Sequence, residues 1–567
     1  MKKRFKSIFT TLLAVLILST TVGCNSGTII EEYDETKSLL TVYSYDGGVG
    51  NVWLDKAIER FEKDYENYSF EPGKVGVQVA ATKKKEGQDL STINQMEDII
   101  FSEWCDIPSL FSTGKTLPIT DIMNVPLNEY LVDENGVPLT NDTDTIEDKL
   151  YDSSKDFFTF KNNQYYGLPH YSHFSGIVYN KALFDKKDLY LAKTPTSNAS
   201  AANLAGYFIS ATNSEKSCGP DGEYGTSDDG LPATYDEFFR FCDYMTKKTV
   251  KPFIWTGSGA NGYTKYLLNA IYLNLAGKEV ADMNYTFNSK GKEIEIVTFE
   301  GSTLVEGTDT VKPDDFDAIF KQKAKYQALE VYDKIIDTAK YQHDTCNNSV
   351  ADNLRAQEDY VKSYNEGNPI AFLVEGSYWY SEATDSYFID DARDIYQEEY
   401  DELNDYRMLP LPRVYSGSAT DVAALKTEGK LHAPVVGDQS DSLAAINANI
   451  ANKPNQIKLA KTFLAYLHTQ ESLAEFTKYS STIKFMNYDV DTSTLLNDYA
   501  KNLWDYVEQC EVVLPYSSHT NYINGKENYT LHIQGHFWDY GDGSPMELLS
   551  GSSNKVSTFF KNYYGRR

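Results

Sequence analysis

The chain has 567 residues and a formal net charge of −29, from 53 basic and 82 acidic side chains. This acidic excess excludes a nucleic-acid-binding protein and a protein that adheres to anionic lipid head groups, because both need a basic surface. Hydrophobic residues make up 41% and aromatic residues 14% of the chain, which excludes disorder, and the length predicts two or three packed units.

The N-terminus has the order of a secretory signal. Basic residues within 2–6 precede a short apolar run at 8–18, and small residues precede Cys24. An apolar run this short indicates a cleaved signal, and no later stretch is long and apolar enough to span a bilayer. The cysteine resembles a lipobox cysteine, which implies a diacylglyceryl thioether on Cys24. We therefore expect a signal peptide over 1–23 and a lipidated tether over 24–37, anchored at the outer face of the cytoplasmic membrane. An ordinary secretory signal that contains a cysteine is the alternative.

The first folded segment predicts a parallel α/β unit. Residues 39–45 read as a buried strand, the Gly-rich turn 46–51 follows, and apolar residues recur at helical spacing over 52–65. A second strand is expected over 75–80. Ligands of such units bind at the carboxyl ends of the strands. The turn lacks the GxGxxG pattern, so it is not a dinucleotide fingerprint.

The segment YGLPHYSHFSGIVYNKALF, residues 166–184, has an extended start around Pro169 and then a cluster of aromatic and His residues. Proline fixes its own φ and biases the residue before it toward extended geometry. A short apolar run then ends at Asn180, from which a helix can start. The pattern is typical of chain that crosses a boundary between two units.

This segment resembles the "YGLP…YNK.LF" segment of the family 1 extracellular solute-binding proteins of bacterial ABC importers. Four later stretches resemble that family in the same order, at 231–239, 252–257, 365–379 and 443–475. Within them Thr234 is a plausible N-cap, with Glu237 as its capping-box partner, and Pro454 starts a helix. Between them, residues 316–339 predict an amphipathic helix. The resemblance implies an α/β, two-lobed periplasmic-binding-protein-like fold of type II, with a hinge between discontinuous lobes and the ligand in the interlobe cleft.

The resemblance also implies where the lobes begin and end. The N-terminal lobe would comprise residues 37–172 plus 434–490, and the C-terminal lobe residues 173–433 plus 491–567. Additional material around 185–230, 280–312 and 510–550 has no counterpart in the family pattern.

Sugar recognition needs flat apolar faces for the C–H side of a pyranose, together with carboxylates, amides and imidazoles for its hydroxyls. For stacking we expect Trp255, Tyr378, Trp379, Trp104 and Tyr45. For hydrogen bonds to hydroxyls we expect Asp46, Asn51, His170, His173 and Glu375. Packing in a core is the alternative interpretation for each aromatic side chain.

Metal ligands and disulfides have weaker support. No carboxylate or cysteine has zinc spacing around His170 and His173 or around His532 and His536, so hydrogen-bonding histidines are preferred. The acidic Gly-rich loop 218–230 fits two interpretations, a solvated turn and a structural calcium site. The calcium ligands would be Asp221, Glu223, Asp228 and Asp229. No other cofactor is expected. Cysteines after residue 24 form no CxxC pair, and both a Cys218–Cys242 bridge and buried free thiols fit the spacing.

The function implied by the resemblance is that of a lipid-anchored, monomeric receptor without enzymatic activity. It would capture an oligosaccharide by hinge closure and deliver it to the permease subunits of an ABC transporter. A secreted carbohydrate-active hydrolase, which needs two carboxylates at the scissile bond, is one alternative. A peptide or polyamine receptor on the same fold is another.

Overall fold

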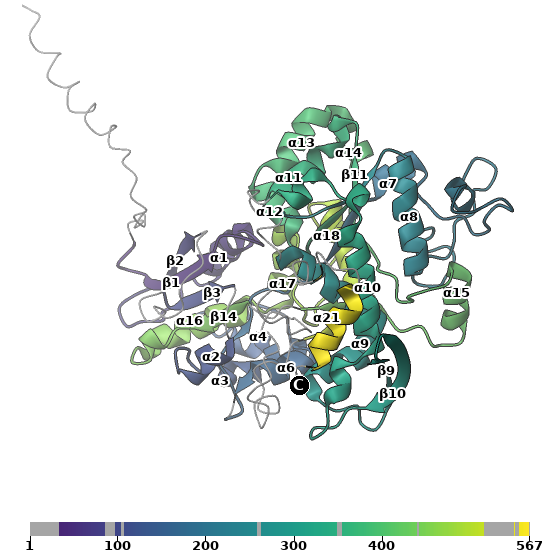
Figure 1. Ribbon diagram of the computed structural model, residues 1–567. Coiled ribbons are helices and arrows are strands. Elements are labelled where there is room, and N and C mark those ends of the chain that lie inside the picture. The colour runs from purple at the N-terminus through teal and green to yellow at the C-terminus, as the bar shows by residue number, and fades with distance from the viewer. Residues whose placement is uncertain are drawn as a thin grey trace, which may run out of the picture.

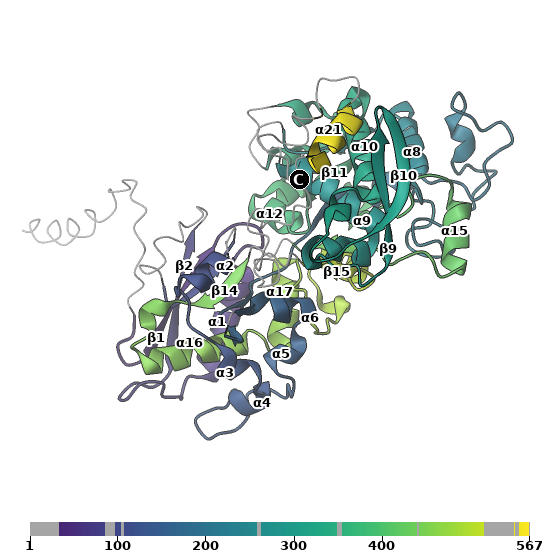
Figure 2. The same cartoon turned by 60° about the horizontal axis from the view of Figure 1, so that its bottom comes forward.

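The computed structural model describes residues 33–84, 97–103, 107–160, 162–257, 262–348, 354–438, 442–514, 549 and 555–565. These residues form two lobes, each built on its own β-sheet and lying at opposite ends of the molecule (Figure 1, Figure 2). The two-lobed α/β fold expected from the sequence is confirmed.

The N-terminal lobe has a five-stranded sheet in the order β2-β1-β3-β14-β6. Strand β1 runs parallel to β2 and β3, whereas β14 runs antiparallel to β3 and β6. Its elements are β1 (Ser38–Tyr45), α1 (Val52–Asp64), β2 (Val77–Lys84), β3 (Ile99–Ser102), α2 (Ile107–Ser112), α3 (Thr120–Met123), α4 (Leu127–Tyr130), α5 (Ile146–Lys149), α6 (Asp152–Phe158), β4 (Thr159–Phe160), β5 (Gln164–Tyr165), β6 (Leu168–Pro169), β14 (Leu443–Ile446), α16 (Pro454–Tyr466) and α17 (Gln470–Ser480). The predicted strand–helix–strand unit is therefore confirmed, with its second strand later than 75–80.

Helix α1 forms because its apolar residues recur on one face and bury there. Trp53 packs edge-on against Phe476 of α17 at a centroid distance of 5.1 Å. Phe61 packs in the same way against Phe463 of α16 at 4.9 Å. Each buried side chain of this size contributes about 1.5–3 kcal/mol. These contacts fix the start of α1, and with it the Gly-rich turn that precedes the helix.

The C-terminal lobe has a four-stranded sheet in the order β12-β7-β11-β8. Strand β11 is antiparallel to β7 and parallel to β8. The elements are β7 (Ser175–Asn180), α7 (Lys181–Lys187), α8 (Tyr235–Lys247), β8 (Lys251–Ile254), α9 (Gly262–Thr286), β9 (Glu293–Glu300), β10 (Thr303–Thr310), α10 (Lys323–Asp337), α11 (Arg355–Lys362), β11 (Ile370–Gly376), α12 (Trp379–Asp385), α13 (Phe388–Tyr396), α14 (Tyr400–Leu403), β12 (Tyr406–Met408), α15 (Ala419–Thr427), β13 (Val435–Gly437), α18 (Asp498–Val507), β15 (Glu511–Val513) and α21 (Lys555–Gly565).

Strand β11 is buried along its whole length, as its continuous apolar sequence predicts for a strand covered on both faces. Phe372 points to the core beneath α8, where it stacks on Phe238 at 5.8 Å. Leu373 points to the opposite core, formed with α11, α12 and α18. Packing on both faces holds the carboxyl end of β11, at Glu375 and Gly376, in a fixed position.

Three chain segments connect the lobes, and two pairs of them are hydrogen-bonded to each other. The first runs through 170–174, the second between β13 and β14, and the third between α17 and α18. Ser172 N–H donates to the Ile483 carbonyl at 3.0 Å, and Phe485 N–H donates to Ser172 Oγ at 2.8 Å. The Ser442 hydroxyl in turn donates to the Tyr171 carbonyl. The expected first crossing is therefore the middle segment of a three-segment hinge.

The additional material lies on the C-terminal lobe. Strands β9 and β10 pair as an antiparallel hairpin at 293–310. The loop before α8 is held by Phe208, which stacks on Tyr244 of α8 at 3.7 Å. Most of the stretch 510–550, with His532 and His536, lies outside the described residues.

Two sequence expectations differ from the structure. The helix expected over 316–339 is interrupted, since a short 3₁₀ turn ends before Gln322 and α10 begins at Lys323. Cys218 and Cys242 are free and buried, as is Cys346, so the bridge between the first two is absent. Among the described residues, every helix falls short of the length and apolarity that crossing a bilayer requires.

Candidate functional site between the lobes

The lobes meet where the Gly-rich turn after β1 faces helix α12. The backbone N–H of Gly48 faces the Glu382 carboxylate across this boundary and favours its charged form. Gly48 has φ +51°, and a Cβ there would lie 3.0 Å from the Tyr171 hydroxyl oxygen. Gly50 has φ +63°, and a Cβ there would lie 2.5 Å from Asp385 Oδ2. Both positions need glycine, because they combine left-handed backbone with a close approach of other groups.

Aromatic side chains from both lobes line this boundary. The Tyr171 ring stacks on the His173 imidazole at 5.2 Å, and Tyr378 meets that imidazole at 5.4 Å with a steep interplanar angle. Tyr378 follows β11 of the C-terminal lobe but packs with the core of the N-terminal lobe. Tyr45, at the end of β1, is part-buried, and burial, then the charges of Glu103 and Glu382, raises the pKa of its hydroxyl. Tyr171 is 2% and Tyr378 9% exposed, so these rings cover one another in this arrangement and present flat faces to a sugar ring only when the lobes part.

Two carboxylates share one amide at the carboxyl end of β11. Gln357 Nε2 donates to Glu382 Oε2 at 2.9 Å and to Glu375 Oε2 at 3.3 Å. Glu375 Oε1 accepts from the N–H of Gly376 at 2.9 Å. Burial, and then the negative charge of Glu382, raises the pKa of Glu375 well above its usual range. Burial also raises the pKa of Glu382 to about 7. At least one of these groups is therefore protonated near neutral pH.

Asp46 and Asn51, both expected to bind hydroxyls, lie together in the turn after β1. Asn51 Nδ2 donates to Asp46 Oδ1 at 2.5 Å. Asn51 is 7% exposed and stands directly before α1. The expected residues that the structure brings to this boundary are thus Tyr45, Asp46, Asn51, His173, Glu375 and Tyr378.

Three expected residues lie elsewhere in the structure, and one lies outside the described residues. Trp255 and Trp379 are 0% exposed inside the cores of the C-terminal lobe, so neither offers a face for stacking on a sugar. His170 is also 0% exposed, packed between Trp53 at 5.3 Å and Phe101 at 5.0 Å. Burial, helped by the charge of Lys484, lowers the pKa of His170 and keeps it neutral. Trp104 is the residue outside the described part of the chain.

Sequence reasoning missed Gln357 and Glu382. Gln357 lies on α11, and its two carboxylate partners follow 18 and 25 residues later on other elements. No local pattern signals such a pairing. Glu382 had a weak signal, because it lies on the first turn of the helix that follows the recognised Gly-Ser-Tyr-Trp segment.

The acidic loop expected as a calcium site uses its carboxylates in its own hydrogen bonds. Asp228 accepts from the N–H of Asp221 at 3.0 Å and from the Thr226 hydroxyl at 2.8 Å. Glu223 pairs with Lys426 at 2.9 Å. Asp229 accepts from the N–H of Gly225 at 2.8 Å. Within the described ranges, no three His, Cys, Asp or Glu side chains are placed to hold a metal ion. Asp228 is only 6% exposed, and burial, then the charge of Asp221, raises its pKa to about 7, so the loop is a turn closed by its own hydrogen bonds.

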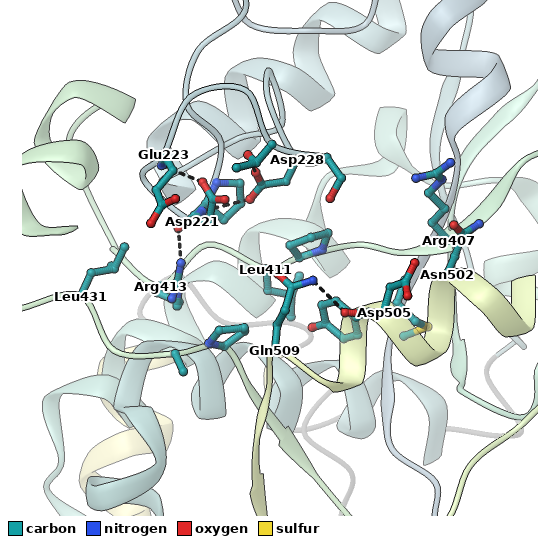
Figure 3. Close-up of a pocket in the computed structure, with 18 of the residues that line it drawn as sticks. Asp221, Glu223, Asp228, Arg407, Leu411, Arg413, Leu431, Asn502, Asp505 and Gln509 are labelled. Carbon is teal, nitrogen blue, oxygen red and sulfur yellow. Dashed lines mark hydrogen bonds between the residues drawn. The ribbon is translucent and has the colours of Figure 1, made fainter. Parts of the chain in front are cut away.

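The same loop borders a pocket of about 670 Å³ inside the C-terminal lobe (Figure 3). Arg413 lies at one side of this pocket and donates to the carbonyl oxygens of Pro220 and His432. Arg407 lies at the other and forms a two-pronged pair with Asp405. These cations are already bonded within the lobe, so the interlobe boundary remains the better candidate site.

Comparisons with known proteins agree with the architecture. Residues 47–334 match the family described as bacterial extracellular solute-binding protein. No curated protein matches the chain in sequence.

Solved structures with the same fold include three sugar-related proteins, each with a TM-score of 0.50. RafE, solved in complex with raffinose, is 10% identical to this chain, and the match covers 94% of this chain and 99% of RafE. The apo form of RafE from Streptococcus pneumoniae is also similar. The GacH receptor of Streptomyces glaucescens, solved with acarbose, is 14% identical, and the match covers 94% of this chain and 98% of the GacH chain. A protein from work on xylan utilisation by Caldanaerobius polysaccharolyticus is 14% identical, and the match covers 92% of this chain and 96% of that protein.

Proposed function

Because the chain belongs to the family of bacterial extracellular solute-binding proteins, we propose that it captures an oligosaccharide and delivers it to an ABC importer. The observation that carries this proposal is the contact between the lobes. Gly48 of one lobe faces Glu382 of the other, and the rings of Tyr171 and His173 in the connecting segment meet Tyr378 of the C-terminal lobe at the same boundary. A ligand held there would contact both lobes at once, which is what a ligand needs in order to favour the closed form.

The choice of a sugar as ligand draws on two lines of support. Rings that offer flat faces lie beside carboxylates and amides that bond hydroxyls, which is the chemistry of a pyranose site. The structural neighbours with raffinose and acarbose show that this fold accommodates such ligands. The proposed ligand-binding residues are Tyr45, Asp46, Asn51, His173, Glu375 and Tyr378, to which the geometry adds Tyr171, Gln357 and Glu382.

Export and anchoring are part of the proposal. Cleavage before Cys24, a lipid on its sulfur and a tether to residue 37 would place a monomeric receptor at the outer face of the membrane. The lobe boundaries at 37–172 plus 434–490 and at 173–433 plus 491–567 are proposed with it. Metabolic labelling with a palmitate analogue tests the anchor, since Cys24→Ala should abolish the label.

The binding proposal is tested by titrating the purified protein with plant and gut oligosaccharides while measuring binding heat and reducing-end release. Saturable heat without release of product is the expected result. Tyr378→Ala should weaken binding, whereas Tyr387→Ala, at a site that is 70% exposed, should not. Catalytic release of product would instead support the carbohydrate-active hydrolase, for which the paired carboxylates Glu375 and Glu382 would be the first residues to test.

A further inference from the structure

The interlobe boundary brings two carboxylates, Glu375 and Glu382, together without a Lys or Arg partner among the described residues. Glu375 is 1% exposed and Gln357 is 0% exposed, and the amide of Gln357 bonds both Glu375 and Glu382. None of the ion pairs found among the described residues includes Glu375 or Glu382. The carboxylate of Asp385 raises the pKa of Glu382, and the imidazole of His173 lowers it.

The same boundary carries buried acceptors that find no donor. Gln357 Oε1 and Asn51 Oδ1 are both buried and lack a hydrogen-bond partner within the part of the chain that the structure describes. Each belongs to an amide whose nitrogen already bonds a carboxylate, Glu375 and Glu382 in one case and Asp46 in the other. Such atoms cost free energy when left unpaired. Each lobe therefore has one buried acceptor next to these carboxylates, and a ligand that brings donors would satisfy it.

Charge distinguishes the ligands that bring donors. A neutral sugar hydroxyl bonds a carboxylate but leaves the buried Glu375 and the part-buried Glu382 to repel each other, so one of them has to stay protonated. An ammonium group has three donors and a full positive charge, so it can hydrogen-bond both carboxylates and offset the repulsion between them. The rings of Tyr171 and Tyr378 suit a cation as well, since their faces attract positive charge.

We infer that the cleft selects a ligand bearing a protonated amine, namely an amino-sugar oligosaccharide, over neutral oligosaccharides. This inference rests on the proposed function and names the ligand class for that same cleft. Glu375 and Glu382 are its specificity-determining residues, and Gln357 positions them. The ammonium would bind between the two carboxylates while the remaining sugar rings contact the aromatic side chains.

The test compares ligands that differ in the amine alone. Glucosamine oligomers, their N-acetylated forms and cello-oligosaccharides of equal length are titrated calorimetrically, with spermidine as a sugar-free amine. Glucosamine oligomers should bind at least about tenfold more tightly than both neutral series, because one charge-assisted hydrogen bond is worth that much. Repeating the titration in two buffers of different ionisation enthalpy should show protons released from the carboxylate pair.

Variants then test whether the preference for amine-bearing oligomers depends on Glu375 and Glu382. Glu382→Gln should reduce affinity for the glucosamine oligomers about 10- to 100-fold and narrow their advantage over neutral ones. Glu375→Gln serves as a second variant, with circular dichroism confirming that both fold. Glu398→Gln makes the same change at an exposed site on the same lobe and should have no effect.

Each outcome has a separate meaning. Equal affinity for amine and neutral oligomers overturns the inference but supports the oligosaccharide receptor. Binding of spermidine without binding of any oligomer supports ammonium recognition and overturns the proposed function. Failure of all four ligand types to bind overturns the inference, and failure of the wider set of plant and gut oligosaccharides overturns the proposed function.

Discussion

Replacing Glu382 by glutamine should stabilise the ligand-free protein, and only at neutral and alkaline pH. The substitution keeps the size of the side chain and an oxygen that can accept from Gly48 N–H and from Gln357. It removes the charge that burial and the neighbouring carboxylates of Asp385 and Glu375 disfavour. The folded variant therefore avoids the free-energy cost of either burying a charge at this position or protonating the carboxylate at neutral pH.

The size of the effect follows from the pKa. Burial raises the pKa of Glu382 from an ordinary value of 4.5 to about 7. At about 1.4 kcal/mol per pKa unit, this rise corresponds to ~3 kcal/mol. The folded state binds the proton more tightly than the unfolded state, so the wild type is fully stabilised below pH 4.5 and loses this stability as pH rises through 7. The advantage of Glu382→Gln should accordingly be near zero at pH 4.5 and up to ~3 kcal/mol at pH 8.

Thermal unfolding followed by calorimetry checks this prediction. Wild type, Glu382→Gln and the exposed control Glu398→Gln are compared at pH 4.5 and pH 8. Glu382→Gln should unfold several degrees higher than the wild type at pH 8 and together with it at pH 4.5, while the control follows the wild type throughout. A variant that is less stable at pH 8, or equally shifted at both pH values, would refute the reasoning.

Three further predictions concern other parts of the structure. Gly50→Ala and Gly73→Ala should each cost about 1–2 kcal/mol in thermal unfolding, because both glycines have positive φ. Only Gly50→Ala should also weaken ligand binding in calorimetry. A Cβ on Gly50 would meet Asp385, whereas nothing lies within 4 Å of a Cβ on Gly73. Equal ligand affinity of the two variants would contradict this prediction. Trp379→Ala should destabilise the protein by ~3–5 kcal/mol while the folded fraction keeps its ligand affinity, and a selective loss of affinity would restore the stacking role. Adding calcium or a chelator should leave the unfolding temperature unchanged, because the loop carboxylates already bond within the loop, and calcium-dependent stabilisation would revive the metal interpretation.

The order of the elements could be predicted from the sequence because local patterns determine most of it. The apolar run that became β1, the spacing of Trp53 and Phe61 in α1, and the Thr234 N-cap of α8 all act over a few residues. The interruption at Gln322 could not be predicted. Its amide is 0% exposed and bonds the Tyr272 hydroxyl and the Val280 carbonyl, contacts made 50 and 42 residues away in sequence.

The residues of the candidate site likewise fall into those that could be predicted from the sequence and those that could not. Tyr45, Asp46 and Asn51 follow a recognisable strand, so their place at its carboxyl end could be read from the sequence. Trp255 and Trp379 follow equally recognisable strands, yet their side chains turn into the cores, because large aromatic faces gain most from burial. The direction in which a side chain leaves a turn depends on the space that the surrounding packing leaves open. That space cannot be predicted from the spacing of residues in the sequence.

The three hydrogen-bonded connections between the lobes limit how the lobes can move. A single connection would allow one lobe to twist freely against the other, whereas segments tied at Ser172, Ile483 and Ser442 allow bending and resist rotation about the long axis of the molecule. Each closure should therefore return Gly48 to the same carboxylate, Glu382, whatever ligand is present. The hinge determines which residues face each other, and the ligand determines only how often and how long they do so.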